Sequence, residues 1–354
     1  MFAGACGARE GGSLQGGTGV TSVVVSSTGG TTEGSSSSTG GTESSTGRGV
    51  TESSSGGTTV RLDVGDVADA GPGQPAGCKG KIDFLFVISR AGQMGIEFEN
   101  GSIYGRLLAS APEFLASIKD KFADFDVHVL VTKGDDKWGS AYCDEECPGP
   151  FTEWCKPGSD YPCEMIGKLP ECDLTWGAGV VFNAGWLAPN KPCDVPDGQR
   201  YISGDQANFD EAFACIMQVG ASGYYLVPQA LAAAVSPQLT GPGGCNEGFL
   251  RDDALLVVTF VTNMLHDVDS KGTPAEWAQA VLDAKGGDVS SVVMHYIGPP
   301  GLEWCEMQKD NRACEFVEYF PYRVVSYALE PTFGPAFDAA TDLVTEACAA
   351  FIPQ

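Results

Sequence analysis

The sequence predicts an α/β fold, with a doubly wound, mostly parallel sheet that is covered by helices on both faces. Apolar stretches of strand length recur along the chain, and two of them, "KIDFLFVIS" and "ALLVVTFVT", are almost uninterrupted. Such runs are typical of strands buried on both faces of a parallel sheet. Segments with helical spacing of apolar residues alternate with these strands, as crossover helices do in a parallel sheet.

The expected elements follow one another in a regular order. In the first helix, the apolar residues Leu107, Phe114 and Ile118 fall on one side, with polar residues between them. The last helix is amphipathic in the same way. Strands are expected at 81–89, 125–131, 254–262, 289–296 and 323–328, and helices at 99–122, 207–219, 225–234, 274–285 and 337–351, with a short helical piece at 316–320.

Composition divides the chain near residue 78. Residues 7–77 are almost wholly Gly, Ser, Thr and other small residues, with no apolar periodicity to bury. We expect this stretch to be a disordered tether, and random-coil scaling for about 70 residues gives it a reach on the order of 45 Å. Residues 78–354 are expected to form one folded domain.

The regular pattern breaks between residues 134 and 199. This stretch is rich in Pro, Gly and aromatic residues and holds six cysteines. Because a structureless loop of that length is uncommon inside a compact domain, we expect an insertion stapled by disulfides. In an open α/β sheet it belongs at a strand end, where binding surfaces lie.

The cysteines indicate an oxidising compartment. Of the thirteen, twelve lie in the folded part, and an even, dense set of this kind predicts up to six disulfides. A zinc site beginning at "CDEEC" is the alternative, but the spacings match no zinc-ribbon template. Twelve cysteines allow too many pairings to predict the connectivity, but two pairings are favoured: Cys78 with Cys348, because both ends of such a sheet lie close together, and Cys305 with Cys314, which would close a short loop. The other candidates are Cys143, Cys147, Cys155, Cys163, Cys172, Cys193, Cys215 and Cys245.

Cys6 stands apart from the others. It follows the small residues "FAGA" and precedes the long tether, as an acylated lipoprotein cysteine does, although only five residues stand before it. We therefore expect residues 1–6 to be the remnant of a lipoprotein signal, with a lipid anchor at Cys6. An ordinary free thiol is the alternative.

The charge of the chain limits its partners. With 21 basic and 46 acidic side chains, the net charge is −25, and nucleic acid or anionic headgroups would be repelled. The apolar stretches are far shorter than the roughly 20 residues of a membrane span. We therefore expect an exported protein, anchored to the outer membrane or extracellular, that touches a membrane only through Cys6.

Four motifs carry a resemblance to a known family. They are "FVISRAGQM" (86–94), "ACIMQVGASG" (214–223), "DALLVVTFVTN" (253–263) and the end "FGPAFDAATDLVTEACAAFIP". In this order they resemble a von Willebrand factor type A domain, and more closely the Cys-rich, lipoprotein-like members found in myxobacteria, which share a Ser/Thr/Gly leader. The similarity covers most of residues 78–354.

The resemblance implies a cation site on three loops, with its ligands replaced. The first-loop Asp of the family falls on Ser89 and the third-loop Asp on Asn263. Magnesium prefers oxygen ligands and one or two carboxylates, and each lost carboxylate forfeits on the order of ten kcal/mol of gross attraction. We expect no metal and no cofactor. One expectation is a metal-free polar surface for a protein partner, with Arg90 as a cationic contact, formed by Ser89, Arg90, Ala91, Gln93, Ser222, Asn263 and His266. The alternative is that these loops have drifted and that another surface, or none, binds.

Enzyme chemistry is not expected. His128 and His295 sit within strand patterns, no catalytic motif occurs, and "GDD" at 134–136 reads as a solvated turn rather than a calcium loop. The expected function is a lipid-anchored module that binds a protein or cell-surface ligand. The alternative is a structural or shielding surface lipoprotein without a specific ligand.

Overall fold

The computed structural model describes residues 23–25, 80–139, 168–264, 267–299, 305 and 311–351. Several residues of the sequence analysis lie outside these ranges, and what was expected of them stays a prediction. They are Cys6, Cys78, Cys143, Cys147, Cys155, Cys163 and His266.

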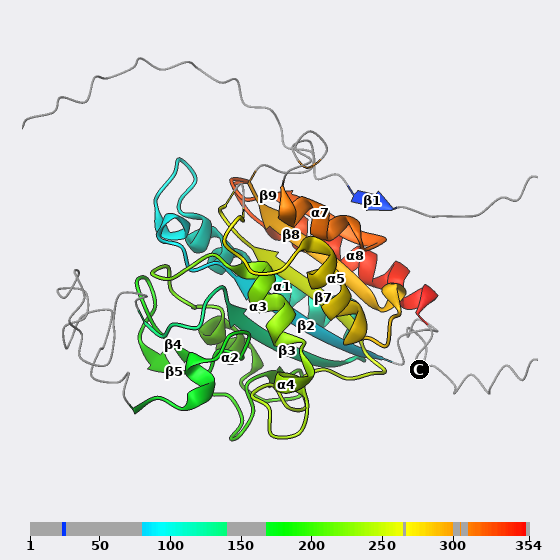
Figure 1. Ribbon diagram of the computed structural model, residues 1–354, viewed down its shortest axis with the longest axis horizontal. Helices are drawn as coiled ribbons and strands as arrows, with labels where there is room; N and C mark the ends of the chain where they lie inside the picture. Colours follow the sequence, from blue (N-terminus) through cyan, green and yellow to red (C-terminus); the bar gives the residue numbers. More distant parts are fainter. Residues whose placement is uncertain are drawn as a thin grey trace, which may run out of the picture.

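A seven-stranded sheet in the order β1-β9-β8-β7-β2-β3-β6 forms the centre of the molecule (Figure 1). Its five central strands are parallel, and the edge strands β1 and β6 are antiparallel to their neighbours. The prediction of an α/β fold with a mostly parallel sheet is confirmed. The strands are β1 (Val23–Val25), β2 (Lys81–Ile88), β3 (Asp126–Lys133), β6 (Ile202–Ser203), β7 (Leu255–Val261), β8 (Val292–Gly298) and β9 (Tyr322–Tyr327).

Helices cover both faces of the sheet (Figure 1), as the long apolar strands require. Alternate residues of β2 point to opposite faces: Phe84 and Phe86 join one apolar core, and Leu85 and Val87 join the other. The first core is shared with α1 (Ile103–Lys121), α2 (Phe209–Ile216) and α8 (Gly334–Ala350), and the second with α3 (Val227–Ala234), α5 (Pro274–Asp283) and α7 (Arg312–Glu318).

Several element boundaries differ from those expected, and side-chain caps account for them. Helix α1 begins at Ile103 because Ser102 accepts a hydrogen bond from Gly105 N. Helix α7 begins earlier than expected because Asn311 caps it, and β8 begins later because Asp288 caps the short 3-10 helix η5 (Val289–Ser291). The remaining short elements are η1 (Gly92–Gly95), η4 (Glu171–Leu174), β4 (Phe182–Asn183), β5 (Lys191–Pro192) and α4 (Pro237–Thr240).

The described end of the predicted insertion lies along the carboxyl half of β3. Val180 N donates to Val131 O at 2.7 Å, and Thr132 Oγ1 donates to Ala178 O at 2.9 Å. This segment continues into the two-stranded sheet of β4 and β5. The insertion therefore contains secondary structure that composition alone did not predict.

Three disulfides join described cysteines: Cys172–Cys245, Cys193–Cys215 and Cys305–Cys314. They confirm the expected pairing of Cys305 with Cys314 and are typical of an oxidising, extracellular environment. Cys348 is also disulfide-bonded; its expected pairing with Cys78 stays a prediction. No helix in the described ranges has the length and apolar character needed to span a bilayer.

Candidate functional site at the carboxyl edge of the sheet

Three loops converge at the carboxyl ends of β2 and β7. Ser89 N donates to Val261 O at 2.8 Å, and Ser89 Oγ donates to Asn263 Oδ1 at 3.3 Å. The loop before α3 closes over them, because Arg90 N donates to Tyr224 O at 3.0 Å. The carboxyl edge of a parallel sheet is where α/β folds place their ligands, and here it brings together residues far apart in the sequence.

The side chains at the positions where the resemblance places metal ligands offer few free oxygen atoms. Ser89 is fully buried, and its hydroxyl also accepts a hydrogen bond from Ala91 N at 3.3 Å. Ala91 supplies no oxygen and is 4% exposed. Gln93 is exposed, and Asn263 is half-buried. The polar groups that these two loops expose to solvent are therefore the side-chain amides of Gln93 and Asn263.

Arg90 forms a buried ion pair, so the expectation that it presents a cationic contact to a partner is wrong. Its side chain is 1% exposed, and its guanidinium lies 2.9 Å from the carboxylate of Asp135, which is fully buried. The guanidinium also donates to the carbonyl oxygens of Lys137 at 2.7 Å, Ala184 at 3.3 Å and Gly139. The charge is neutralised inside the protein.

Asp135 is held as firmly as Arg90. Its carboxylate accepts from Tyr224 N at 2.7 Å and from Lys137 N at 3.1 Å. The interpretation of residues 134–136 as a solvated turn is therefore wrong for Asp135. Sequence reasoning missed this partner because it stands 45 positions from Arg90.

Two glycines make room for the ion pair. A Cβ at Gly223 would lie 1.8 Å from Asp135 Oδ2, and a Cβ at Gly185 would lie 2.9 Å from the Arg90 guanidinium. Gly185 also has a φ of +118°, which only glycine adopts readily. Ser222 lies beside them, accepting from Trp186 N at 3.2 Å and donating to Gly139 O at 3.2 Å. Ser222 thus joins the loops and is half-buried.

A second polar cluster lies beneath this edge. Arg200 pairs with Asp173 and donates to Gly179 O at 2.7 Å. Lys133 donates to Asp173 O at 3.0 Å and to Lys137 O. Burial lowers the pKa of Lys133 to about 7, and the charge of Arg90 acts in the same direction.

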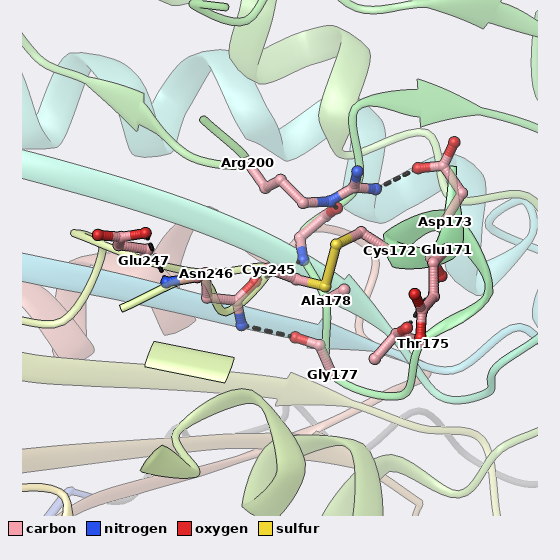
Figure 2. Close-up of a disulfide and its surroundings, with 12 residues drawn as sticks. Glu171, Cys172, Asp173, Thr175, Gly177, Ala178, Arg200, Cys245, Asn246 and Glu247 are labelled. Atoms are coloured by element: carbon pink, nitrogen blue, oxygen red, sulfur yellow. Dashed lines mark hydrogen bonds and ion pairs between the residues drawn. A yellow bond between two sulfur atoms is a disulfide. The ribbon is translucent and has the colours of Figure 1, made fainter. Parts of the chain in front are cut away.

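The disulfide Cys172–Cys245 anchors this cluster, and Figure 2 shows it between the Asp173–Arg200 pair and Asn246. The Asn246 amide accepts from Gly179 N at 2.9 Å and donates to Gly177 O at 2.9 Å. Asn246 is fully buried. The covalent bond and the amide together fix the inserted segment against the loop before β7.

Exposed apolar side chains surround the converging loops. We call Ile96, Phe98, Leu187, Tyr224 and Val268 the apolar rim; their exposed fractions are 49%, 45%, 43%, 44% and 71%. They come from the segment after β2, the loops around Gly185 and Gly223, and the loop after β7. A hydrogen bond from Tyr225 Oη to Asp269 ties the last two loops together.

Leu187 has an unusual backbone. Its φ is +67°, a left-handed conformation that is costly for a branched, bulky residue. The turn is closed by bonds from Ala188 N to Gly185 O at 3.0 Å and from Gly185 N to Asn190 Oδ1 at 3.0 Å. The surrounding turn thus holds an apolar side chain out toward solvent.

The two described histidines lie in strands, as expected. His295 in β8 is fully buried between Thr259 Oγ1 at 3.4 Å and Ser326 Oγ at 3.3 Å, and burial lowers its pKa to about 3. His128 in β3 bonds to Phe249 O at 3.0 Å, and burial lowers its pKa as well. Neither faces the converging loops.

Comparisons with known proteins give only distant similarities. No family model and no curated protein matches the chain. Among solved structures, 77% of the chain is similar to 47% of proximal thread matrix protein 1 from the mussel byssus, with 13% identity and a TM-score of 0.34. It is also similar, over 77% of its length and 31% of the other chain, to the pilus adhesin SpaC from Lactobacillus rhamnosus GG, with 11% identity and a TM-score of 0.32. The chain therefore spans less than half of either structure, and neither similarity identifies a family or a function.

Proposed function

We propose that the chain is an exported protein-binding module of the von Willebrand factor A type, which engages a partner protein through the carboxyl edge of its sheet without a divalent cation. The apolar rim is the observation that carries this proposal. Five of the eight large apolar side chains exposed in the described ranges belong to it. A concentration of this kind on loops at a strand end is typical of a protein interaction site, whereas single exposed apolar residues are ordinary.

The energetics favour a rim of this composition. Full burial of one large apolar side chain contributes about 1.5–3 kcal/mol, and aromatic residues such as Phe98 and Tyr224 are enriched at protein–protein interfaces. The strained backbone at Leu187 adds to this argument, because strained backbone conformations cluster at functional sites. Gln93 and Asn263 supply amide groups for hydrogen bonds within the same surface.

A partner would meet a preformed surface. The buried pair of Arg90 and Asp135 ties the loops together from inside, and the disulfides Cys172–Cys245 and Cys193–Cys215 hold the inserted segment. Fixing loops in advance lowers the entropy that binding must remove. In this proposal the internal ion pair takes the organising role that a bound cation has in the family that the sequence resembles.

The proposed location is the cell surface, with a lipid at Cys6 and a tether drawn from residues 7–77, of which Val23–Val25 pairs with β9 in the sheet. The disulfides support export into an oxidising compartment. The partner would be a protein at or near the same surface. If the apolar rim has no role in binding, the alternative function is that of a shielding surface protein without a specific ligand.

A matched pair of tyrosines tests the proposal. Tyr224 in the rim and Tyr319 at the opposite edge of the sheet are each 44% exposed. Binding of the fluorescently labelled protein to intact cells of the producing strain is measured for Tyr224→Ser, Tyr319→Ser and the parent. We expect Tyr224→Ser to weaken binding at least about tenfold, the loss of about 1.4 kcal/mol, and Tyr319→Ser and excess EDTA to change nothing. Equal loss in both variants, or loss with EDTA, would overturn it.

A further inference from the structure

Strand β1 lies at one edge of the sheet, beside β9 and antiparallel to it. The residue pairs are Val23 with Val324, Val24 with Arg323 and Val25 with Tyr322. β-Branched residues favour strands, and Val23–Val25 is the longest apolar run between residues 7 and 77. The tether therefore contains a segment that is suited to pair with the edge of the folded domain.

Strand β9 offers an edge to which an extended segment can pair. Its inner side is occupied by β8, and within the described ranges β1 is its strand neighbour on the outer side. An uncovered edge presents unpaired N–H and C=O groups, and such edges bind extended segments by adding a strand. Three of the six residues of β9 pair with β1. The outer side of β9 is therefore a docking surface for a strand.

Charge and chain length favour the segment around β1 as the occupant. Residues 11–32 carry no charged side chain, whereas the whole chain has a net charge of −25. An acidic strand would be repelled by such a protein, but an uncharged one is not. The linker between β1 and β2 has roughly 50 residues, and a flexible linker holds the strand at an effective concentration of up to about a millimolar. Pairing within one chain is therefore favoured over pairing between two copies.

The docking should be reversible because the strand is short. Closing a loop of roughly 50 residues costs conformational entropy, and three residue pairs oppose that cost. Each cross-strand pair and each backbone hydrogen bond contributes only modestly, so the gain and the cost are of the same order. The docked and the released states are therefore both accessible.

We propose that Val23–Val25 is a releasable clasp, which shortens the tether when it is docked on β9 and restores the full length when it is released. In the docked state, residues 7–22 separate Cys6 from the sheet, and random-coil scaling gives this stretch a reach of about 22 Å. The released tether reaches on the order of 45 Å. The clasp therefore changes about twofold how far the domain stands from a lipid at Cys6. That consequence rests on the anchor in the proposed function, whereas the docking itself does not.

A spin label next to β1 reports the docking. A nitroxide is attached at residue 26 through Ser26→Cys, in protein that also carries Cys6→Ser, because its unpaired electron weakens the NMR signals of nearby amides. The amide signals of Tyr322 and Arg323 should lose at least twofold in intensity relative to the reduced, diamagnetic label. The signals of β6, at the other edge of the sheet, should not change.

A pair of prolines tests whether the docking is strand pairing. Successive N–H groups of a strand point to opposite sides, so Val23→Pro together with Val24→Pro removes one donor that faces β9. This variant should lose the effect on Tyr322. The matched control, Ser35→Pro together with Ser36→Pro, lies in the linker and should keep it.

A mixed sample identifies the source of the strand. Spin-labelled protein without nitrogen-15 is mixed with unlabelled, nitrogen-15 protein, so that only docking between copies weakens the signals of β9. We expect no loss in the mixture. Equal loss there would show that the strand comes from a second copy, and loss that survives both prolines would show contact without pairing. Either result, or no loss in the first sample, would overturn the proposal. The protein in these samples carries no lipid, so the outcome is independent of the anchor and of the apolar rim.

Discussion

Arg90 and Asp135 show how a single side chain changes the character of the carboxyl edge. A guanidinium is hard to bury unless its charge and most of its N–H groups are satisfied. Here one carboxylate and three carbonyl oxygens accept from the two terminal nitrogens, while Nε has no acceptor among the described residues. The side chain of Ser89, one position earlier, turns to Asn263 instead. Neighbouring residues of one strand end thus serve two separate networks.

Removing one member of this pair should be costly. Asp135→Asn leaves the Arg90 charge buried without a counterion, and we expect the free energy of unfolding to fall by about 3–5 kcal/mol. Asp210→Asn is the control, because its partner Lys119 forms an exposed ion pair, with 56% and 50% of the two side chains accessible. That change should cost less than about 1 kcal/mol. Urea unfolding with the disulfides intact measures both, and similar losses would contradict the prediction.

His295 should make the fold sensitive to acid. Its pKa is about 3 in the folded protein against an ordinary value of 6.5, because burial disfavours the charged ring. The unfolded chain therefore binds the proton first as pH falls. The stabilisation is fully present above pH 6.5 and is lost progressively toward pH 3, by about 2 kcal/mol between pH 7 and pH 5.

A substitution isolates this contribution. His295→Gln should lose about 2 kcal/mol less stability than the parent between pH 7 and pH 5, whatever its stability at pH 7. Denaturant unfolding at the two pH values measures the difference. His128→Gln should reduce the acid-induced loss of stability by a smaller amount, because His128 is partly exposed and burial lowers its pKa to a lesser extent. Parallel acid dependence in the parent and His295→Gln would refute the assignment.

At the scale of elements, predictability follows the length of the pattern. Strands β2 and β7 are runs of buried apolar residues, and the sequence predicted both within one or two positions. Strands β4, β5 and β6 have two residues each, too few for any periodicity, and were not predicted. The convergence of the three loops was expected from the resemblance, whereas the burial of Arg90 depends on a tertiary contact that no local pattern encodes.

The loops at the carboxyl edge should differ sharply in their tolerance of a methyl group. Gly223→Ala places a Cβ 1.8 Å from Asp135 Oδ2 and 3.0 Å from Arg90 Cβ, so the ion pair must move. We expect a loss of at least about 2 kcal/mol in stability. Gly92→Ala, in the first loop of the same edge, meets only Ala221 O at 3.8 Å and should stay within about 0.5 kcal/mol of the parent. Denaturant unfolding of the two variants checks this, and equal stability would contradict it.

The disulfides should contribute according to the loops they close. Cys172–Cys245 spans 73 positions and Cys193–Cys215 spans 22. The chain-entropy model gives about 4 kcal/mol for the first and about 3 kcal/mol for the second. The paired Ala variants should therefore rank in that order in urea unfolding. The reverse order would show that local packing, such as the contact of Asn183 with the Cys215 sulfur at 3.2 Å, outweighs loop closure.

For the whole molecule, the important relation is between the sheet and its carboxyl edge. The parallel strands bring the ends of β2 and β7 side by side, so residues from distant parts of the chain meet at the same edge. The fold therefore brings three loops together at this edge, and Ser89 and Asn263 lie there at the positions where the resemblance places carboxylates. The arrangement of the loops and the chemistry of the side chains on them are separate properties of the sequence. The arrangement alone does not determine which ligand is bound.

Magnesium should consequently leave the stability of the intact protein unchanged. A cation bound to the folded state alone stabilises it by about 2.7 kcal/mol at a concentration of 100 Kd, which for a chain of this size is a Tm rise of several degrees. We expect no such rise with magnesium or manganese and no fall with EDTA. The variant that combines Ser89→Asp and Asn263→Asp is the positive comparison, because two carboxylates return the attraction that a hard dication requires. A cation-dependent rise in the parent that both Ser89→Ala and Asn263→Ala abolish would show that the edge binds metal after all, and the apolar rim would then have to be understood as the surroundings of a cation-bridged contact.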